Sequence, residues 1–134
     1  MAKMPKEMMD LLKDPQASKV LATADSGGKL NVVPKGSLSA IDEETVAYAF
    51  ISEGKTEANL KATSKVAAAV FKLGMPPTGY QVKGTFEGFQ ASGPLFDRFA
   101  KMLKGMKIEA KAVGTIKVEE VYSVSLAERG RKVA

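Results

Sequence analysis

Residues 18–38, SKVLATADSGGKLNVVPKGSL, decide the fold of this chain. Residues 18–24 are predicted to form a strand, Asp25-Ser26-Gly27-Gly28 a tight turn, and residues 30–38 the strand that returns. A turn with two adjacent glycines between two such segments is typical of a β-hairpin. We therefore expect the sheet to begin with antiparallel pairing.

The other predicted elements continue this pattern along the chain. The sequence predicts helices at residues 4–13, 56–63 and 94–107, strands at 45–51, 65–73, 80–90 and 118–126, a loop at 74–79 and a frayed tail at 128–134. Because hairpins join most of the strands, we expect a mainly β fold with flanking helices: an antiparallel β-barrel rather than a doubly wound parallel sheet. The 134 residues, 45% of them hydrophobic, suit a single domain over residues 1–134.

Composition excludes several kinds of chemistry. The chain has no cysteine and no histidine, which excludes thiol nucleophiles, iron–sulfur ligation, a Ser-His-Asp triad and nearly all zinc or copper sites. No metal site is expected, and redox chemistry would have to come from a bound cofactor. The N-terminal residues lack the apolar core of a signal peptide, and no apolar run is long enough to cross a membrane. A cytoplasmic protein without membrane partners is therefore expected.

One stretch of the sequence indicates a binding site. Residues 52–60, SEGKTEANL, leave a predicted strand and open a helix. The N-terminus of a helix offers unpaired N–H groups and partial positive charge to an anion. Lys55 adds a full charge and Thr56 a hydroxyl, so together they predict a phosphate site, in keeping with a net charge of +5. The alternative is that Thr56 only caps the helix and Lys55 is only solvated.

Gly54-Lys55-Thr56 also matches the last three residues of the GxxxxGK(S/T) phosphate-binding loop of nucleoside triphosphatases. That motif needs a glycine where this chain has Ala49. A different resemblance covers more of the chain. Residues 54–59 (GKTEAN), 78–84 (TGYQVKG) and 92–96 (SGPLF) occur in the order and spacing of the FMN-binding split-barrel group, which includes pyridoxamine 5'-phosphate oxidase and small bacterial proteins that bind flavin mononucleotide (FMN). The chain most resembles the latter. This resemblance implies a split barrel and a homodimer with one FMN per subunit near the interface.

The resemblance also implies which residues contact the cofactor. Lys55 and Thr56 would grip the phosphate, and Asn59 would help hold the phosphate loop. The ribityl chain and ring would lie along two strand segments and a glutamine: Val32, Val33, Pro34, Lys35, Phe50, Ile51, Ser52 and Gln81. Lys35 would either tune the ring or reach the phosphate, and the sequence does not decide between these roles. The loop at residues 75–78 could close over the ring.

Departures from the family pattern limit what activity is expected. The oxidases carry two arginines near their phosphate site, whereas this chain has no arginine between Met1 and Gln90. Pro34 lacks an N–H to donate to the flavin edge. These differences argue against pyridoxamine 5'-phosphate oxidation. The resemblance still implies an FMN-dependent oxidoreductase of unknown substrate and unknown catalytic residues, reduced by NAD(P)H or a redox partner.

Two alternatives remain open from the sequence. One is a non-enzymatic flavoprotein, either an electron carrier or an FMN store. The other is a cofactor-free barrel that binds nucleic acid, which the positive charge allows. The absence of tryptophan and an aromatic content of only 7% give little support to base stacking, so nucleic acid is not the expected partner.

Overall fold

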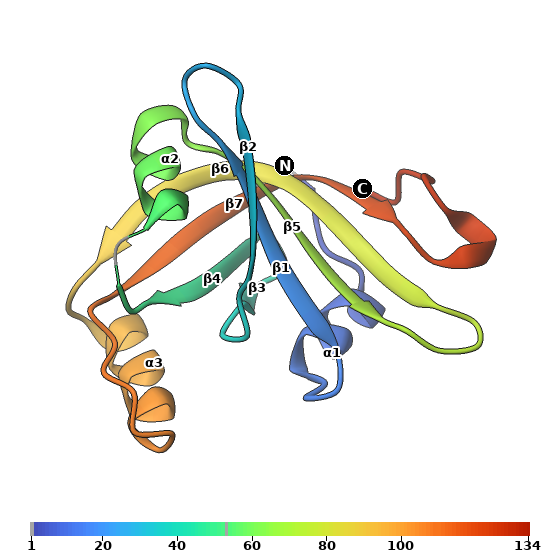
Figure 1. Ribbon diagram of the computed structural model, residues 1–134. Coiled ribbons are helices and arrows are strands. Elements are labelled where there is room, and N and C mark those ends of the chain that lie inside the picture. The colour runs from blue at the N-terminus through green and yellow to red at the C-terminus, as the bar shows by residue number, and fades with distance from the viewer. Residues whose placement is uncertain (1, 53) are drawn as a thin grey trace.

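The computed structural model describes residues 2–52 and 54–134; Glu53, which belongs to the motif quoted above, and Met1 lie outside the described residues. These residues form one antiparallel sheet of seven strands in the order β2-β1-β5-β6-β7-β4-β3, with three α-helices around it (Figure 1). The elements are α1 (Lys6–Lys13), β1 (Ser18–Ala24), β2 (Leu30–Pro34), β3 (Ser39–Asp42), β4 (Thr45–Phe50), α2 (Lys55–Thr63), β5 (Lys65–Lys72), β6 (Thr78–Gln90), α3 (Pro94–Lys104), β7 (Ala112–Ser123) and a short 3-10 turn, η1 (Leu126–Glu128).

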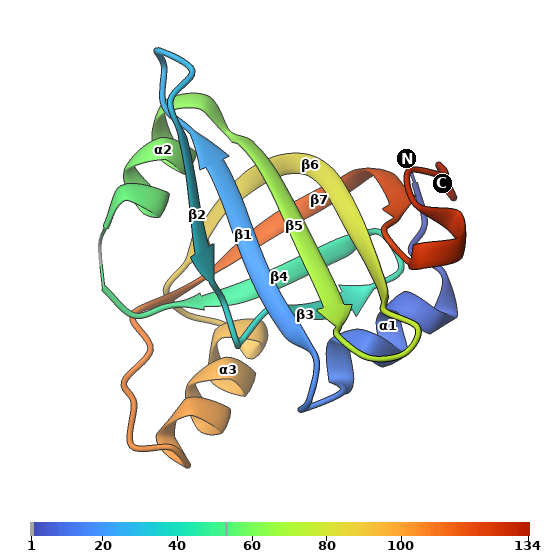
Figure 2. The same cartoon turned by 45° about the vertical axis from the view of Figure 1, so that its right-hand side comes forward.

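The sheet curls into a split barrel, with β1 and β5 crossing over β4 and β3 (Figure 2). The register explains which side chains point inward. Val33, Leu21, Ala68, Val82 and Val121 lie opposite one another on five successive strands and face the core. The residues next to these on each strand point to the outer face of the sheet, because side chains alternate along a strand. The predicted fold class, a mainly β antiparallel split barrel with flanking helices, is confirmed.

Two of the helices pack through apolar side chains. Met8 and Leu12 of α1 are buried in the main core, and Phe99 and Leu103 of α3 pack with Val113 of β7 and with alanines of β4 in a second cluster. Such stripes provide most of the stability of short helices. Among the residues that the structure describes, no helix has both the length and the apolar character to span a membrane.

Helix α2 packs differently, because most of its buried side chains are polar. Thr56, Glu57 and Asn59 are almost fully buried, and Leu60 is its one buried apolar residue among those described. Asn59 donates a hydrogen bond to the hydroxyl of Thr23 on β1 at 3.0 Å. Hydrogen bonds with the sheet therefore hold this helix in place, since a buried polar group needs such a partner.

The predicted second strand, residues 30–38, is wrong in its extent. β2 ends at Pro34, and the chain turns at residues 35–38, where the N–H of Leu38 bonds to the carbonyl of Lys35. A separate strand, β3, then pairs with β4 at the opposite edge of the sheet. The turn sends the chain from one edge of the sheet to the other, which a continuous strand could not do.

The C-terminal predictions need two corrections. β7 begins at Ala112 rather than at residue 118. The sequence did not predict residues 112–116 as a strand because they are all buried and show no alternation of polar and apolar side chains. The tail is not frayed: Tyr122 and Lys132 form a β-bridge, and the N–H of Val133 bonds to the carbonyl of Val121. The tail pairs with the end of β7, beyond the residues that pair with β4. Helix α3 ends at Lys104, three residues before the predicted end.

Candidate functional site

The N-terminus of α2 lies at the end of β4 and beside β2 and the β1–β2 turn (Figure 1). Lys55 opens the helix and its side chain is 58% exposed, with its ammonium 3.9 Å from a carboxylate oxygen of Asp25 in that turn. A separation this long between partly exposed groups is a weak ion pair. An anion that binds here could therefore replace Asp25 as the partner of the Lys55 ammonium.

Thr56 is joined to β2. Its hydroxyl oxygen accepts a hydrogen bond from the side-chain amide of Asn31 at 3.2 Å, and the residue is almost fully buried. The interpretation of Thr56 as the helix cap is wrong, because Gly54 occupies the cap position. The Thr56 hydroxyl still has its own proton to donate.

A buried carboxylate, Glu57, connects three elements at this site. One oxygen accepts the N–H of Gly54 at 3.0 Å and the other accepts the hydroxyl of Tyr48 on β4 at 3.2 Å. The ammonium of Lys35, just after β2, lies 3.6 Å from the second oxygen and 4.9 Å from the centre of the Tyr48 ring. Glu57 is 2% exposed, so Lys35 supplies the charge that its burial requires.

Sequence reasoning missed Glu57 and did not single out Tyr48. Burial, together with the Glu57 carboxylate, raises the pKa of Tyr48 well above its usual range, so the phenol stays protonated and donates. One signal could have found Glu57: a glutamate three positions after a cap residue often accepts the N–H of that residue. Its burial against Lys35 depends on the tertiary structure.

β2 offers free backbone groups to a ligand because it is an edge strand. The N–H of Lys35 bonds to the carbonyl of Lys19 in β1. This bond shows which residues of β2 direct their backbone groups toward β1, because every second residue does so in an antiparallel pair. By that alternation, the N–H and C=O of Val32 and the C=O of Pro34 point away from β1. The side chain of Val33, in contrast, faces the core.

A cavity of about 390 Å³ lies between the end of β2, the end of β4 and α3. Its volume is within the usual range for small-molecule sites. Lys35 is the one charged group among its described lining residues, and most of the others are apolar: Pro34, Gly36, Ser37, Ala49, Ile51, Met102, Leu103, Met106 and Ile108. Lys35 thus stands between this cavity and Glu57.

The structure gathers some of the predicted site residues and separates others. Ile51 lines the cavity and Ser52 is exposed beside it. The ring of Phe50 packs against Phe89 at 5.2 Å between centroids, which directs it to the sheet. Asn59 is bound to Thr23 in the interior, away from Lys55.

Gln81 and the loop at residues 75–78 lie elsewhere in the chain. Gln81 is on the outer face of β6, in the row Pro34–Val20–Ala69–Gln81. Three strand spacings separate it from Pro34, about 14 Å. The loop joins β5 to β6 at the end of β5 remote from α2 (Figure 2). Within one chain, neither reaches the site at α2.

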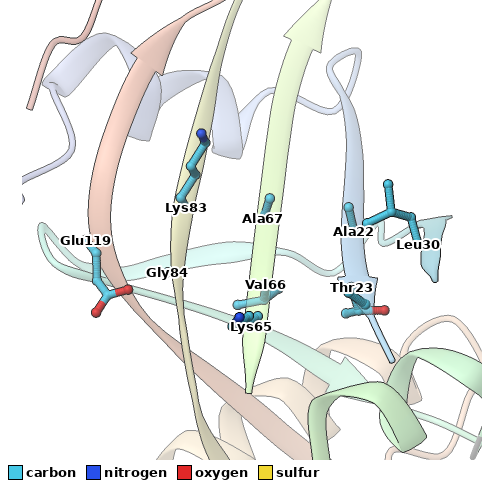
Figure 3. A pocket seen from close by; sticks show the side chains of 10 residues that line it. Ala22, Thr23, Leu30, Lys65, Val66, Ala67, Lys83, Gly84 and Glu119 are labelled. Carbon is cyan, nitrogen blue, oxygen red and sulfur yellow. The ribbon is translucent and has the colours of Figure 1, made fainter. Parts of the chain in front are cut away.

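A shallow pocket of about 320 Å³ marks this outer face (Figure 3). Ala22 and Ala67 pair in its floor, with Leu30 on one side and Lys83 and Glu119 on the other. Leu30 is 81% exposed and Val32, in the same row as Ala22, is 65% exposed. Large exposed apolar side chains around a flat floor are typical of a surface that another molecule covers.

Comparisons with known proteins agree with this fold. A family model described as pyridoxamine 5'-phosphate oxidase matches residues 4–125. No curated protein matches the chain in sequence. HupZ of Group A Streptococcus is 29% identical, with a TM-score of 0.83 over 98% of this chain and 99% of that one.

Two other solved structures share the fold. An FMN-binding protein from Syntrophomonas wolfei is 25% identical, with a TM-score of 0.81 over 90% of this chain and 86% of that one. HutZ, the heme storage protein from Vibrio cholerae, has a TM-score of 0.66 over 90% of this chain and 94% of that one. At 12% identity, HutZ is similar in fold alone.

Proposed function

This chain belongs to the pyridoxamine 5'-phosphate oxidase family, and we propose that it is an FMN-binding flavoprotein that acts as an oxidoreductase on a substrate still to be identified. The observation that carries this proposal is the arrangement at α2: a helix N-terminus with Lys55, next to the free edge of β2 and a cavity of about 390 Å³. The likeness to an FMN-binding protein supports the choice of cofactor.

Each part of FMN has a matching feature in this arrangement. The phosphate would meet Lys55, the Thr56 hydroxyl and the first free N–H groups of α2. The ribityl hydroxyls would bond to the backbone of Val32 at the edge of β2. The ring would lie at the mouth of the cavity against Pro34 and Ile51, with Lys35 in its wall. Bound FMN would supply acceptance of a hydride or of single electrons, and the chain would position it and limit access of water.

Heme is a poorer fit to these residues. Of the side chains that serve as axial ligands of heme, the sequence lacks histidine and cysteine and has only methionine and tyrosine. Lys55 and the N-terminus of α2 suit a compact phosphate, whereas a heme has two separated carboxylates. The lack of cysteine also fits the reducing cytoplasm, where we place the protein.

We place a homodimer interface on the outer face of β2, β1, β5 and β6. Leu30 and Val32 are largely exposed there, beside the floor of Ala22 and Ala67. Gln81 lies on the same face, too far from Pro34 to reach a flavin held by its own chain. If a second copy of the chain packs on this face, the Gln81 of each subunit comes closer to the flavin held by the other subunit. The dimer would then complete the site.

A non-enzymatic carrier or FMN store is the second candidate. The observation in its favour is that Lys35, the one charged group among the described residues lining the cavity, is paired with Glu57. No described acid or base is therefore ready to exchange a proton with a substrate there. Turnover with NADH or NADPH separates the two candidates: an enzyme consumes the reductant continuously, whereas a carrier requires a partner protein to be reduced.

The first experiment is to purify the protein with excess FMN, record its visible spectrum and identify what denaturation releases. We expect a yellow protein that releases FMN and not FAD. A colourless protein that takes up no FMN by fluorescence titration would refute the proposal.

A further inference from the structure

Four charged side chains around the N-terminus of α2, counted among the residues that the structure describes, form two ion pairs. Lys55 lies 3.9 Å from Asp25, and Lys35 lies 3.6 Å from Glu57. Two ammonium groups thus face two carboxylates, and these four side chains have no net charge. This is unexpected for a site that would hold a phosphate with up to two negative charges.

The Lys35–Glu57 pair is the more protected of the two. Side-chain exposures are 21% for Lys35 and 3% for Glu57, compared with 58% for Lys55 and 27% for Asp25. Ion pairs are screened less when they are buried. An arriving phosphate can therefore displace Asp25 from Lys55 more easily than it can displace Glu57 from Lys35.

The charge of Glu57 is not needed for its two hydrogen bonds. The N–H of Gly54 needs only an acceptor oxygen, which a glutamine amide also has, and the Tyr48 hydroxyl can donate or accept. The feature of Glu57 that a glutamine could not replace is the negative charge beside Lys35. That charge sits at the third residue of α2, within one helical turn of any anion at the N-terminus.

We propose that Glu57 sets the affinity of this site for phosphate esters: its carboxylate cancels the charge of Lys35, leaves Lys55 as the cation offered to the phosphate, and so keeps flavin binding reversible. This inference rests on the proposed function, because it takes the N-terminus of α2 as the phosphate site. It makes FMN an exchangeable ligand rather than a permanently held one. Glu57 acts through charge and does not itself touch the phosphate.

The size of the effect follows from Coulomb's law. For unit charges about 10 Å apart in an effective dielectric of about 20, removing one charge changes an affinity about tenfold. Because the phosphate carries up to two such charges, we expect Glu57→Gln to bind FMN at least about tenfold more tightly than the wild type. Riboflavin, which lacks the phosphate, should change by less than about twofold, because it tests the ring site alone.

The test compares four proteins by fluorescence titration with FMN and with riboflavin: wild type, Glu57→Gln, Lys35→Met/Glu57→Gln, and Glu87→Gln. The double variant removes both charges, so the ratio of its FMN affinity to its riboflavin affinity should return to near the wild-type ratio, whatever Lys35 contributes to the ring site. Glu87 is an exposed residue of β6, so Glu87→Gln changes the net charge equally without altering the site. Equal weakening of both flavins by Glu57→Gln, or no change in FMN affinity, would overturn the proposal.

A second ligand separates this proposal from the proposed function. If the wild type binds neither flavin, the proposed function fails, and inorganic phosphate is titrated into the same four proteins with thermal unfolding as the readout. Tighter phosphate binding by Glu57→Gln alone supports the role of Glu57 in that case. Equal phosphate binding by all four proteins, or no binding by any of them, overturns it.

Discussion

Replacing Lys55 with alanine tests the phosphate site most directly. A charge-assisted hydrogen bond contributes about 1.5–3 kcal/mol, or roughly 10- to 150-fold in affinity. Lys55 is 58% exposed and must first leave Asp25 at 3.9 Å, so the lower end of this range applies. We expect Lys55→Ala to weaken FMN binding about tenfold.

The assay is titration of flavin-free protein followed by flavin fluorescence, with FMN and riboflavin in parallel at low and high salt. Riboflavin affinity should stay the same, and the loss of FMN affinity should shrink at high salt, because salt screens charges at exposed sites. Lys101→Ala, at an exposed position of α3, serves as the matched control. Unchanged FMN affinity in Lys55→Ala, or equal weakening of both flavins, would refute the assignment of the phosphate site.

Three further predictions concern stability and assembly. Gly114→Ala should destabilise the barrel by about 1–3 kcal/mol in urea unfolding, because the added Cβ would lie 2.9 Å from Cε1 of Tyr48; an unchanged midpoint would contradict this packing. Hydrogen bonds from Lys72 and from the backbone lower the pKa of Asp14 below its unfolded value, so its ionised form stabilises the fold at neutral pH and this contribution disappears as the pH falls below about 4. The stability difference between wild type and Asp14→Asn should therefore vanish in acid, and a constant difference from pH 7 to pH 2 would argue against it. Val32→Glu, which puts a charge on the outer face, should shift the protein to a monomer in analytical ultracentrifugation; a persisting dimer would place the interface elsewhere.

The fold was predictable where local signals were strong. β1 occupies the predicted residues, because the glycine-rich turn at 25–28 limits where the hairpin can begin and end. The start of β7 was not predictable, since Gly114 is a poor strand residue by propensity. The fold requires a glycine at position 114 because Tyr48 and Phe86 fill the space that a Cβ would take. These side chains come from distant parts of the chain, so the requirement cannot be read from the local sequence.

At the candidate site, the position of Lys55 was predictable from the sequence, whereas the pairing of the charged side chains was not. Lys55 follows directly from the strand-to-helix motif, and the structure places it at the helix N-terminus. The sequence left the role of Lys35 open between the flavin ring and the phosphate. Its partner could not be inferred, because Glu57 is buried against Lys35 only when α2 lies on β2 and β4.

The polar attachment of α2 has a consequence for how a ligand could enter and leave. Thr56, Glu57 and Asn59 would all be well solvated if the helix detached, and Leu60, which packs in the main core, is the one apolar side chain that the helix itself buries among its described residues. The buried face of α2 is therefore less apolar than those of α1 and α3, so we expect its detachment to carry the smallest hydrophobic penalty of the three. We therefore expect local opening at α2 to cost less free energy than opening of the barrel, which would let a ligand exchange without global unfolding.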